Sequence, residues 1–400
     1  MKISGIRKLF GFEGYSISSI SFSPDIVHIQ LQRDKRRRLA CPQCDRTMGK
    51  NDENPRTVLD MPLCGADVVM VQYNAIQGRC RHCGAYATFH PPGVSNHAKA
   101  TRRLKEFVSR LCRYMPSSHV GEFVGISHET ARRWDKEILA EKIGEPKLDG
   151  LRYILIDEKS IGKRHQYVTV VLHGETGELL YLKPGKKKAT LEGFFELLSR
   201  EQRESVEGAC VDRGGAYKEA VKTHLPNAEI IYDKFHLISN LGDAIDKVRR
   251  EEVANANEDE KKVIKGQRYN LLRNAENLTD KQSGTLEMLL EINESLHAAY
   301  VLKEGFRWVW EYTYPKNAEK YLRKWCDWVT ESGLAPLKHF AKGVLRDIQG
   351  VLAYFRHGIT NGPIEAFNSI IGRAIYRACG IKDLDYLFLK LRQESITSSP

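Results

Sequence analysis

Long apolar segments are missing from this sequence of 400 residues, and no apolar run is long enough to span a bilayer. The first residues, MKISGIRKLF, lack the apolar centre and the small-residue cleavage site of a signal peptide. The sequence also contains no internal repeat and no low-complexity tract. Its nine cysteines are an odd number, which argues against a framework of disulfide bonds. These absences predict a cytoplasmic protein without a membrane partner.

Basic residues, in contrast, are in excess. The 62 Lys and Arg against 51 Asp and Glu give a net charge of +11. Such an excess favours a polyanionic partner, most often nucleic acid, although a merely basic, well-solvated surface remains the alternative. The charge is concentrated between His97 and Lys136, with nine Lys or Arg against four Asp or Glu, and in the run DKRRRLA from Asp34 to Ala40.

Four of the cysteines form two CxxC pairs, Cys41 with Cys44 and Cys80 with Cys83. A CxxC turn supplies two thiolates, and two such turns complete a tetrahedral zinc site. The segment between the pairs contains strand patterns that predict a small sheet, and Cys64 within it is a spare candidate ligand. The spacing favours Zn²⁺ over four unrelated thiols. Because four thiolates leave no open position for water, the zinc would be structural.

The stretch from Thr101 to Leu139 has the pattern of a helix-turn-helix. Apolar residues keep helical spacing, Gly125 supplies the turn, and Ser127 is a suitable cap for the next helix. That helix is polar and basic, as a helix that enters the major groove of DNA must be. Any three-helix bundle with a basic face is the alternative. The predicted DNA-binding residues are Ser127, His128, Thr130, Arg132, Arg133 and Lys136.

From Arg152 onward, strand and helix patterns alternate. Three strands, a helix, a strand, a helix and a strand are the order expected of an RNase H-like α/β fold. The first three strands would form an antiparallel meander, and the later two would add in parallel. The expected strands cover Tyr153–Ile156, Tyr167–Leu172, Leu179–Leu182, Val206–Asp212 and Ala228–Asp233, and the expected helices cover Ala189–Arg203, Tyr217–His224 and a long segment from about His236.

Acidic residues lie at the ends of two of these predicted strands. Asp157 and Asp212 would lie at neighbouring strand tips, and Glu365, in TNGPIEAFNSIIGRA, would face them from the first turn of a later helix. Three such carboxylates suit Mg²⁺ (or Mn²⁺), which prefers hard oxygen ligands and can activate a water or a DNA 3′-hydroxyl. Taken singly, a strand-end Asp or a helix N-terminal Glu is commonplace, so the prediction depends on the combination.

Two pairs of residues near the predicted metal site are interpreted separately. Side chains alternate along a strand, so Asp157 and Glu158 point to opposite faces. We assign the metal to Asp157 and expect Glu158 to face solvent or to pair with Lys159, Lys163 or Arg164. Asp233 and His236 form a D-x-x-H pattern just past a strand. They either orient the metal ligands or are simply a helix cap and a packed histidine.

These segments together resemble the DDE transposases of bacterial insertion sequences, specifically the ISL-three group. The resemblance covers nearly the whole chain and is most specific in LIDEKSIGKRHQYVTVV, VDRGGAYKEAVKTHLPNAEIIYDKFH and TNGPIEAFNSIIGRAIYRACG. It implies that Asp157, Asp212 and Glu365 are the catalytic triad that holds Mg²⁺, and it matches Asp233 and His236 to a family signature. One departure is Arg213, which follows Asp212 where the family commonly has an uncharged or aromatic residue.

The predicted fold class is a multidomain protein with an N-terminal zinc-binding β-rich module, a helix-turn-helix and an RNase H-like α/β core with a helical insertion. The resemblance implies the insertion, whose Trp308 and Trp310 would stack on bases or, as we favour, be core residues. The expected boundaries are 1–95 for the zinc-binding module, 96–145 for the helix-turn-helix, 150–250 for the first part of the core, 251–355 for the insertion and 356–400 for the last core helices.

The predicted function is that of a transposase, which binds the terminal inverted repeats of an insertion sequence and catalyses metal-dependent strand cleavage and transfer. Its partners would be double-stranded DNA, as element ends and target, and a second copy of the chain, because synapsis of two ends needs at least a dimer. Such a protein would be cytoplasmic and nucleoid-associated. A catalytically idle DNA-binding regulator derived from a transposase is the alternative, and a structure-specific nuclease of the same fold ranks last.

Overall fold

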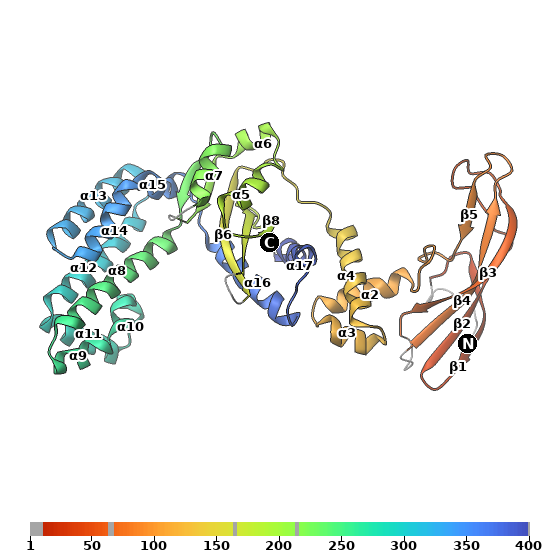
Figure 1. The fold of residues 1–400 in the computed structure, drawn as a ribbon, viewed down its shortest axis with the longest axis horizontal. Helices are drawn as coiled ribbons and strands as arrows, with labels where there is room; N and C mark the ends of the chain where they lie inside the picture. Colours follow the sequence, from red (N-terminus) through yellow and green to blue (C-terminus); the bar gives the residue numbers. More distant parts are fainter. Residues whose placement is uncertain (1–10, 63–67, 163–165, 213–215, 399–400) are drawn as a thin grey trace. The chain divides into compact units, whose positions relative to one another are not determined.

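A computed structural model of the chain describes residues 11–62, 68–162, 166–212 and 216–398 (Figure 1). The chain divides into two compact units. The first unit contains the residues up to Glu145 together with Arg373–Gln393, and the second contains Pro146–Gly372 and the residues from Glu394. Within the described ranges, no helix is both long enough and apolar enough to cross a membrane.

A five-stranded sheet forms the first part of the first unit (Figure 1). Its order is β1-β2-β4-β3, with β5 paired to β4. Along β2, Val27, Ile29 and Leu31 are buried and alternate with more exposed residues, so one face of the sheet covers an apolar core. The strands are β1 Tyr15–Phe22, β2 Ile26–Arg33, β3 Gly49–Asp60, β4 Val68–Arg79 and β5 Tyr86–Phe89. As predicted, β3 and β4 lie between the two cysteine pairs.

Three helices follow, α2 Arg102–Cys112, α3 Ser117–Val124 and α4 His128–Ile143. The chain turns between α3 and α4 at Gly125, whose φ of 72° lies in the left-handed region that glycine adopts most readily. Ser127 then caps α4, because its side chain accepts a hydrogen bond from the backbone N–H of Thr130 at 3.2 Å. The Gly125 turn and the Ser127 cap lie where the sequence predicted them, and α4 extends past the predicted stretch to Ile143.

The start of α17, Leu384–Ser398, packs within the same unit as these helices. Asp135 of α4 is fully buried, and its carboxylate accepts hydrogen bonds from Ser109, at 2.7 Å, and from Tyr386, at 2.6 Å. Lys390 adds an ion pair with Asp135 at 3.1 Å. A buried carboxylate needs such partners, so these contacts join α17 to α4. No local pattern in the sequence predicts this pairing.

A second five-stranded sheet, of order β10-β9-β6-β7-β8, forms the centre of the second unit. The pairs β6–β7 and β7–β8 are antiparallel, whereas β6–β9 and β9–β10 are parallel. This is the meander followed by two parallel strands that the sequence predicted. The strands are β6 Tyr153–Gly162, β7 Gln166–His173, β8 Leu179–Pro184, β9 Gly208–Val211 and β10 Glu229–Tyr232.

The helices of this α/β segment are α5 Lys188–Phe195, α6 Arg200–Ser205, α7 Ala216–His224 and α8 Lys234–Asn255. The single helix expected over Ala189–Arg203 is in fact two helices. Ser199 begins the second one with a capping box, in which its side chain accepts from the backbone of Gln202 and the Gln202 side chain accepts from the backbone of Ser199. Leu191, Phe194 and Phe195 of α5 are buried in the core.

Residues 258–357 are helical, as the resemblance implied. The elements are α9 Glu258–Lys265, α10 Arg268–Leu272, η1 Ala275–Asn277, α11 Asp280–Ile292, α12 Glu294–Arg307, η2 Trp308–Glu311, α13 Pro315–Glu331, α14 Ala335–Arg346 and α15 Ile348–His357. Trp310 stacks on Phe355 with ring centroids 5.8 Å apart, as a core residue would. Trp308 is 62% exposed, so the expectation that it is a core residue was wrong.

The helix α15 lies against the edge strand β10. A Cβ atom on Gly350 would be 2.4 Å from the ring of Tyr232, so only glycine permits this approach. The close packing fixes the chain just before α16, Gly362–Arg377, which carries Glu365. The strand β10 and the part of α16 up to Gly372, which includes Glu365, belong to the second unit.

Candidate active site

Strand register brings three aspartates to the same level of the second sheet. Tyr153 of β6 is opposite Gly208 of β9, which is opposite Glu229 of β10. The same register, continued along the chain, aligns Asp157, Asp212 and Asp233. The latter two directly follow the last residues of β9 and β10, as predicted. Asp157 is not at a strand tip as expected, because β6 continues to Gly162 through its pairing with β7.

The carboxylate of Asp157 is held at both oxygens. Its Oδ1 accepts a hydrogen bond from the backbone N–H of Glu158 at 2.7 Å, and its Oδ2 accepts one from the side-chain amide of Asn368 at 2.6 Å. Asn368 lies three residues after Glu365 on α16, so it occupies the same side of the helix. Asn368 was not among the predicted site residues, although its spacing from Glu365 was a usable signal.

His236 lies between the acids that it was expected to orient. Its Nδ1 is 3.0 Å from Oδ1 of Asp212. Potential ligand atoms of His236, Asp157 and Asp212 all lie within 4.8 Å of one another, and the same is true of His236, Asp233 and Glu365. The imidazole therefore belongs to both groups, and the five side chains form one cluster, which we call the carboxylate cluster.

Asp233 is buried and ties two helices to the sheet. One of its oxygens caps α8 by accepting from the backbone N–H of His236 at 3.0 Å, and the other accepts from the backbone N–H of Asn361 at 3.4 Å. The buried Oδ1 of Asn361 has no hydrogen-bond partner among the described residues, and neither has Oδ1 of Asn368. Buried polar atoms without partners suit a site that takes a ligand.

Burial and mutual repulsion raise the pKa values of these acids. Burial raises the pKa of Asp157, and it raises the pKa of Asp212 to about 6. The charge of Asp157 raises the pKa of Asp212 further, while the nearby His236 lowers it. Burial and the charge of Asp233 also raise the pKa of Glu365. A divalent cation would relieve this repulsion, and the oxygen-rich donors fit Mg²⁺.

The acid next to Asp157 lies outside this cluster. Glu158 is exposed, as predicted, and its ion-pair partner among the described residues is Lys186, at 3.7 Å, rather than Lys159. Lys163 and Arg164, the other expected partners, lie outside the described residues. Arg213, which departs from the family pattern after Asp212, lies outside them too.

The four cysteines of the CxxC pairs converge on one point. The Sγ atoms of Cys41 and Cys83 are 3.5 Å apart, as are those of Cys44 and Cys80, and all four lie within 4.8 Å of one another. A disulfide would need about 2.05 Å. Tetrahedral zinc, with Zn–S near 2.3 Å, separates its sulfurs by about 3.8 Å. We call this group the cysteine cluster, and it is compatible with structural zinc. The spare candidate Cys64 lies outside the described residues.

Both CxxC turns have the same pattern of backbone hydrogen bonds. The N–H of Cys41 donates to Arg46 and the N–H of Asp45 donates back to Cys41, at 2.8 and 2.9 Å. Cys80 repeats this pattern with Ala85 and Gly84, at 2.8 and 3.0 Å. Hydrogen bonds from the backbone of Cys83 and His82 lower the pKa of Cys80 to about 6. The second turn thus stabilises a thiolate at Cys80, the form that binds metal, whereas burial and hydrogen bonds with the neighbouring thiols raise the pKa of Cys44 to about 12.

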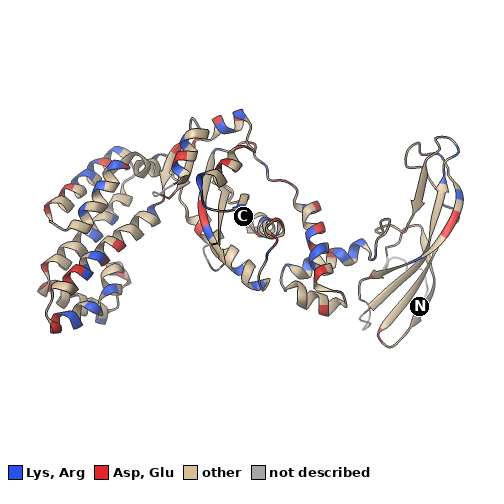
Figure 2. Cartoon of the chain, viewed as in Figure 1, with Lys and Arg blue, Asp and Glu red and all other residues tan. Residues whose placement is uncertain are grey.

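Most of the predicted DNA-binding residues are exposed at the start of α4. Ser127, His128, Arg132 and Arg133 are exposed, and Thr130 is partly buried. Lys136 forms an ion pair with Asp383 at 2.7 Å, so its charge is already partly neutralised. Figure 2 shows Lys and Arg also gathered along α2. These positions leave a polar, basic helix start available to a ligand.

Comparison with known proteins identifies relatives over the whole chain. The family model of the DDE transposases of the ISL-three group, described as "Transposase", matches residues 154–391. The transposase for insertion sequence element IS1001 of Bordetella parapertussis is 29% identical over 395 residues, which cover 97% of each chain. The transposase for insertion sequence element IS1557, from two strains of Mycobacterium tuberculosis, is 27% identical over 306 residues, which cover 70% of this chain and 68% of the relative.

Proposed function

The chain belongs to the DDE transposases of the ISL-three group, and from this we propose that it cleaves DNA at the ends of an insertion sequence and transfers the cut strands to a target. The observation that carries the proposal is the alignment of Asp157 and Asp212 on neighbouring parallel strands, with His236 close both to them and to Glu365. The strand order supports an RNase H-like core, with residues 251–355 as an insertion before the last helices.

In this proposal Asp157, Asp212 and Glu365 hold the metal. When bound, Mg²⁺ (or Mn²⁺) supplies a Lewis acid that activates the attacking oxygen and stabilises the leaving oxygen of a phosphodiester. Asn368 fixes the orientation of the Asp157 carboxylate. His236 lies beside Asp212, and Asp233 caps α8. The two contacts hold the start of α8 next to the acids.

DNA recognition in this proposal begins with the helix-turn-helix. The start of α4 enters the major groove at the inverted repeats, with Arg132 and Arg133 contacting bases or phosphates. The cysteine cluster holds Zn²⁺ as a structural ion. Two copies of the chain join two ends, so the active form is a dimer or larger, and its place is the cytoplasm, on the nucleoid. An idle regulator would not need the acids that this chain retains.

The test is strand cleavage by the purified protein. With Mg²⁺ and a duplex that carries the inverted repeats of its element, the protein is expected to nick at the element ends. A duplex with scrambled repeats, and a reaction with a chelator in place of Mg²⁺, are the controls. Nicking that is absent, or that does not depend on the metal, contradicts the proposal.

A further inference from the structure

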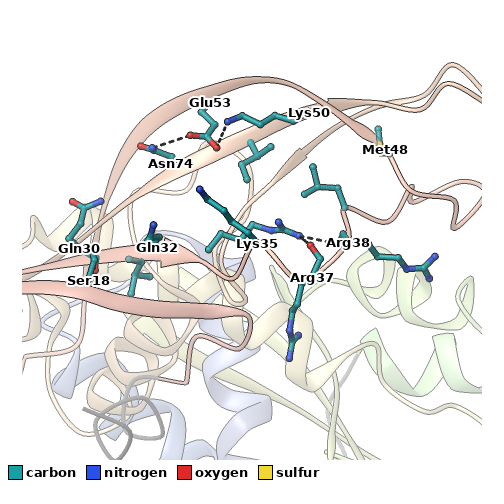
Figure 3. A pocket seen from close by; sticks show the side chains of 14 residues that line it. Ser18, Gln30, Gln32, Lys35, Arg37, Arg38, Met48, Lys50, Glu53 and Asn74 are labelled. Carbon is teal, nitrogen blue, oxygen red and sulfur yellow. Dashed lines mark hydrogen bonds and ion pairs between the residues drawn. The ribbon is translucent and has the colours of Figure 1, made fainter. Parts of the chain in front are cut away.

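The polar face of the amino-terminal sheet is hollow. A pocket of about 750 Å³ lies on this face and takes side chains from every strand of the path β1-β2-β4-β3. Ser18 comes from β1, Gln30 and Gln32 from β2, Asn74 from β4 and Lys50 from β3. The residues that alternate with these on β2, Ile29 and Leu31, are buried in the apolar core, and Leu31 also borders the pocket. We call this pocket the basic hollow (Figure 3).

Cations dominate its lining. Arg33, Lys35, Arg37, Arg38 and Lys50 face one acid, Glu53. Lys50 neutralises that acid at 2.6 Å, and Arg37 and Arg38 pair with Glu13 and Asp45, which do not line the hollow. Arg33 and Lys35 therefore keep the charge of the hollow positive. Figure 3 shows Lys35 among the residues that line the hollow. The pKa of Glu53 is lowered mainly by its hydrogen bond with Lys50, and the charge of Lys35 lowers it further. An excess of cations over acids in a concave polar site favours an anionic ligand.

The loop that carries the cations is fixed in place. The guanidinium of Arg33 donates to the backbone carbonyl of Arg37 and, at 3.1 Å, to that of Arg38. Below the loop, Leu39 and Met48 join their backbones by a 2.7 Å hydrogen bond and pack with Cys41 and Cys80 in one apolar cluster. The cysteine cluster thus supports the floor of the basic hollow, which indicates a preformed site.

The chemistry of the lining distinguishes between two forms of nucleic acid. Proteins that bind single strands stack the bases on aromatic side chains. None of the described residues that line the hollow is aromatic. They offer instead guanidinium, ammonium, amide and hydroxyl groups, which are the groups that contact the sugar–phosphate backbone of duplex DNA.

We propose that the basic hollow binds the sugar–phosphate backbone of duplex DNA, so that the amino-terminal module is a second DNA-binding surface beside the helix-turn-helix. The inference rests on the proposed function only in taking DNA as the partner. Because backbone contacts carry no sequence information, the hollow adds affinity equally for element ends and for random DNA. Sequence preference then comes from α4.

Two adjacent cations of the same loop give a matched test. Lys35 lines the hollow, whereas Arg36 does not line it, is 90% exposed and pairs with Asp34. In the full-length protein, Lys35→Glu is expected to weaken binding to a random-sequence duplex by about 10-fold or more and to lower the slope of log K against log salt by about 1. Arg36→Glu makes the same charge change outside the hollow and should have a clearly smaller effect.

Binding is measured by fluorescence anisotropy over a series of salt concentrations, with zinc content and circular dichroism to establish that each variant is folded. Lys35→Arg keeps the charge and should bind as the wild type does. Equal losses from Lys35→Glu and Arg36→Glu, or no loss from Lys35→Glu, would overturn the inference. The random duplex needs no element ends. A failure of nicking at those ends, with the Lys35 effect intact, would therefore contradict the proposed function alone.

Discussion

The two candidate metal clusters of this chain are built in opposite ways. The cysteine cluster comes from two copies of one short turn, and each turn supplies a pair of ligands with its own backbone hydrogen bonds. The carboxylate cluster takes single residues from β6, the ends of β9 and β10, and the starts of α8 and α16. Its members come together only when the sheet and both helices are assembled.

This difference corresponds to a difference in chemistry. Four thiolates close a tetrahedral site and leave no position for a reactant. The carboxylate cluster is more open: Glu365 is exposed, and the Oδ1 atoms of Asn361 and Asn368 lack partners among the described residues. We infer that the first cluster stabilises a module and that the second performs the reaction. A substitution in one cluster should therefore leave metal binding at the other cluster unchanged.

The largest effect is expected from Asp212→Asn. The substitution removes a ligand charge and should lower metal-dependent nicking by about 1000-fold or more. Zinc content and DNA affinity should not change, because the cysteine cluster and α4 are intact. Asp243→Asn, an exposed change on α8, is the control and should nick normally. An active Asp212→Asn protein would remove Asp212 from the site.

Next in size is Cys80→Ser, which should reduce zinc content to background and destabilise the amino-terminal module, because structural zinc provides much of the folding free energy of such modules. Zinc analysis and thermal unfolding measure both effects. Mn²⁺ binding at the carboxylate cluster should persist. Cys379→Ser, at an exposed cysteine, should leave zinc content and unfolding unchanged. Full zinc content in Cys80→Ser would mean that the cysteine cluster is not the zinc site.

A smaller loss is expected from Asn368→Ala. Without its 2.6 Å hydrogen bond the Asp157 carboxylate can rotate, and removal of such a supporting group typically lowers metal affinity or activity by about 10- to 100-fold. Mn²⁺ titration and nicking rates should fall together. Ser369→Ala, at the next and exposed residue, is the matched control. If both variants bind Mn²⁺ equally well, Asn368 does not position Asp157.

The smallest effect is expected from a change of pH. Burial raises the pKa of Asp212 to about 6, above the usual value near 3.9, so the folded protein holds this proton more tightly than the unfolded chain does. Without metal, the contribution of Asp212 to stability falls as pH rises through this window. Metal must displace the proton, so Mn²⁺ affinity should fall by roughly tenfold per pH unit below about pH 6.

Calorimetric titration of Mn²⁺ above and below that pH measures the effect. Asp212→Asn should remove both the high-affinity binding and its pH dependence. A wild-type affinity that stays constant across the window would show that Asp212 does not exchange a proton for the metal.

Local features of the molecule were predictable from the sequence, and non-local ones were not. The CxxC turns, the Gly125 turn with its Ser127 cap and the positions of the strands along the chain each depend on a few consecutive residues. The contact of Asn368 with Asp157, the burial of Asp135 under Tyr386 and the exposure of Trp308 depend on segments far apart in the chain. The apolar pattern of β6 ends at Ile156, but the strand continues because hydrogen bonding to β7 does not require apolar side chains.

The most direct measurement compares two neighbouring acids in one nicking assay. Asp157 is part of the carboxylate cluster, whereas Glu158 is exposed and pairs with Lys186. With Mg²⁺ and a duplex that carries the element ends, Asp157→Asn should abolish cleavage and Glu158→Gln should retain most of it, while both variants bind DNA as the wild type does. Comparable losses from the two substitutions, or normal cleavage by Asp157→Asn, would contradict the account.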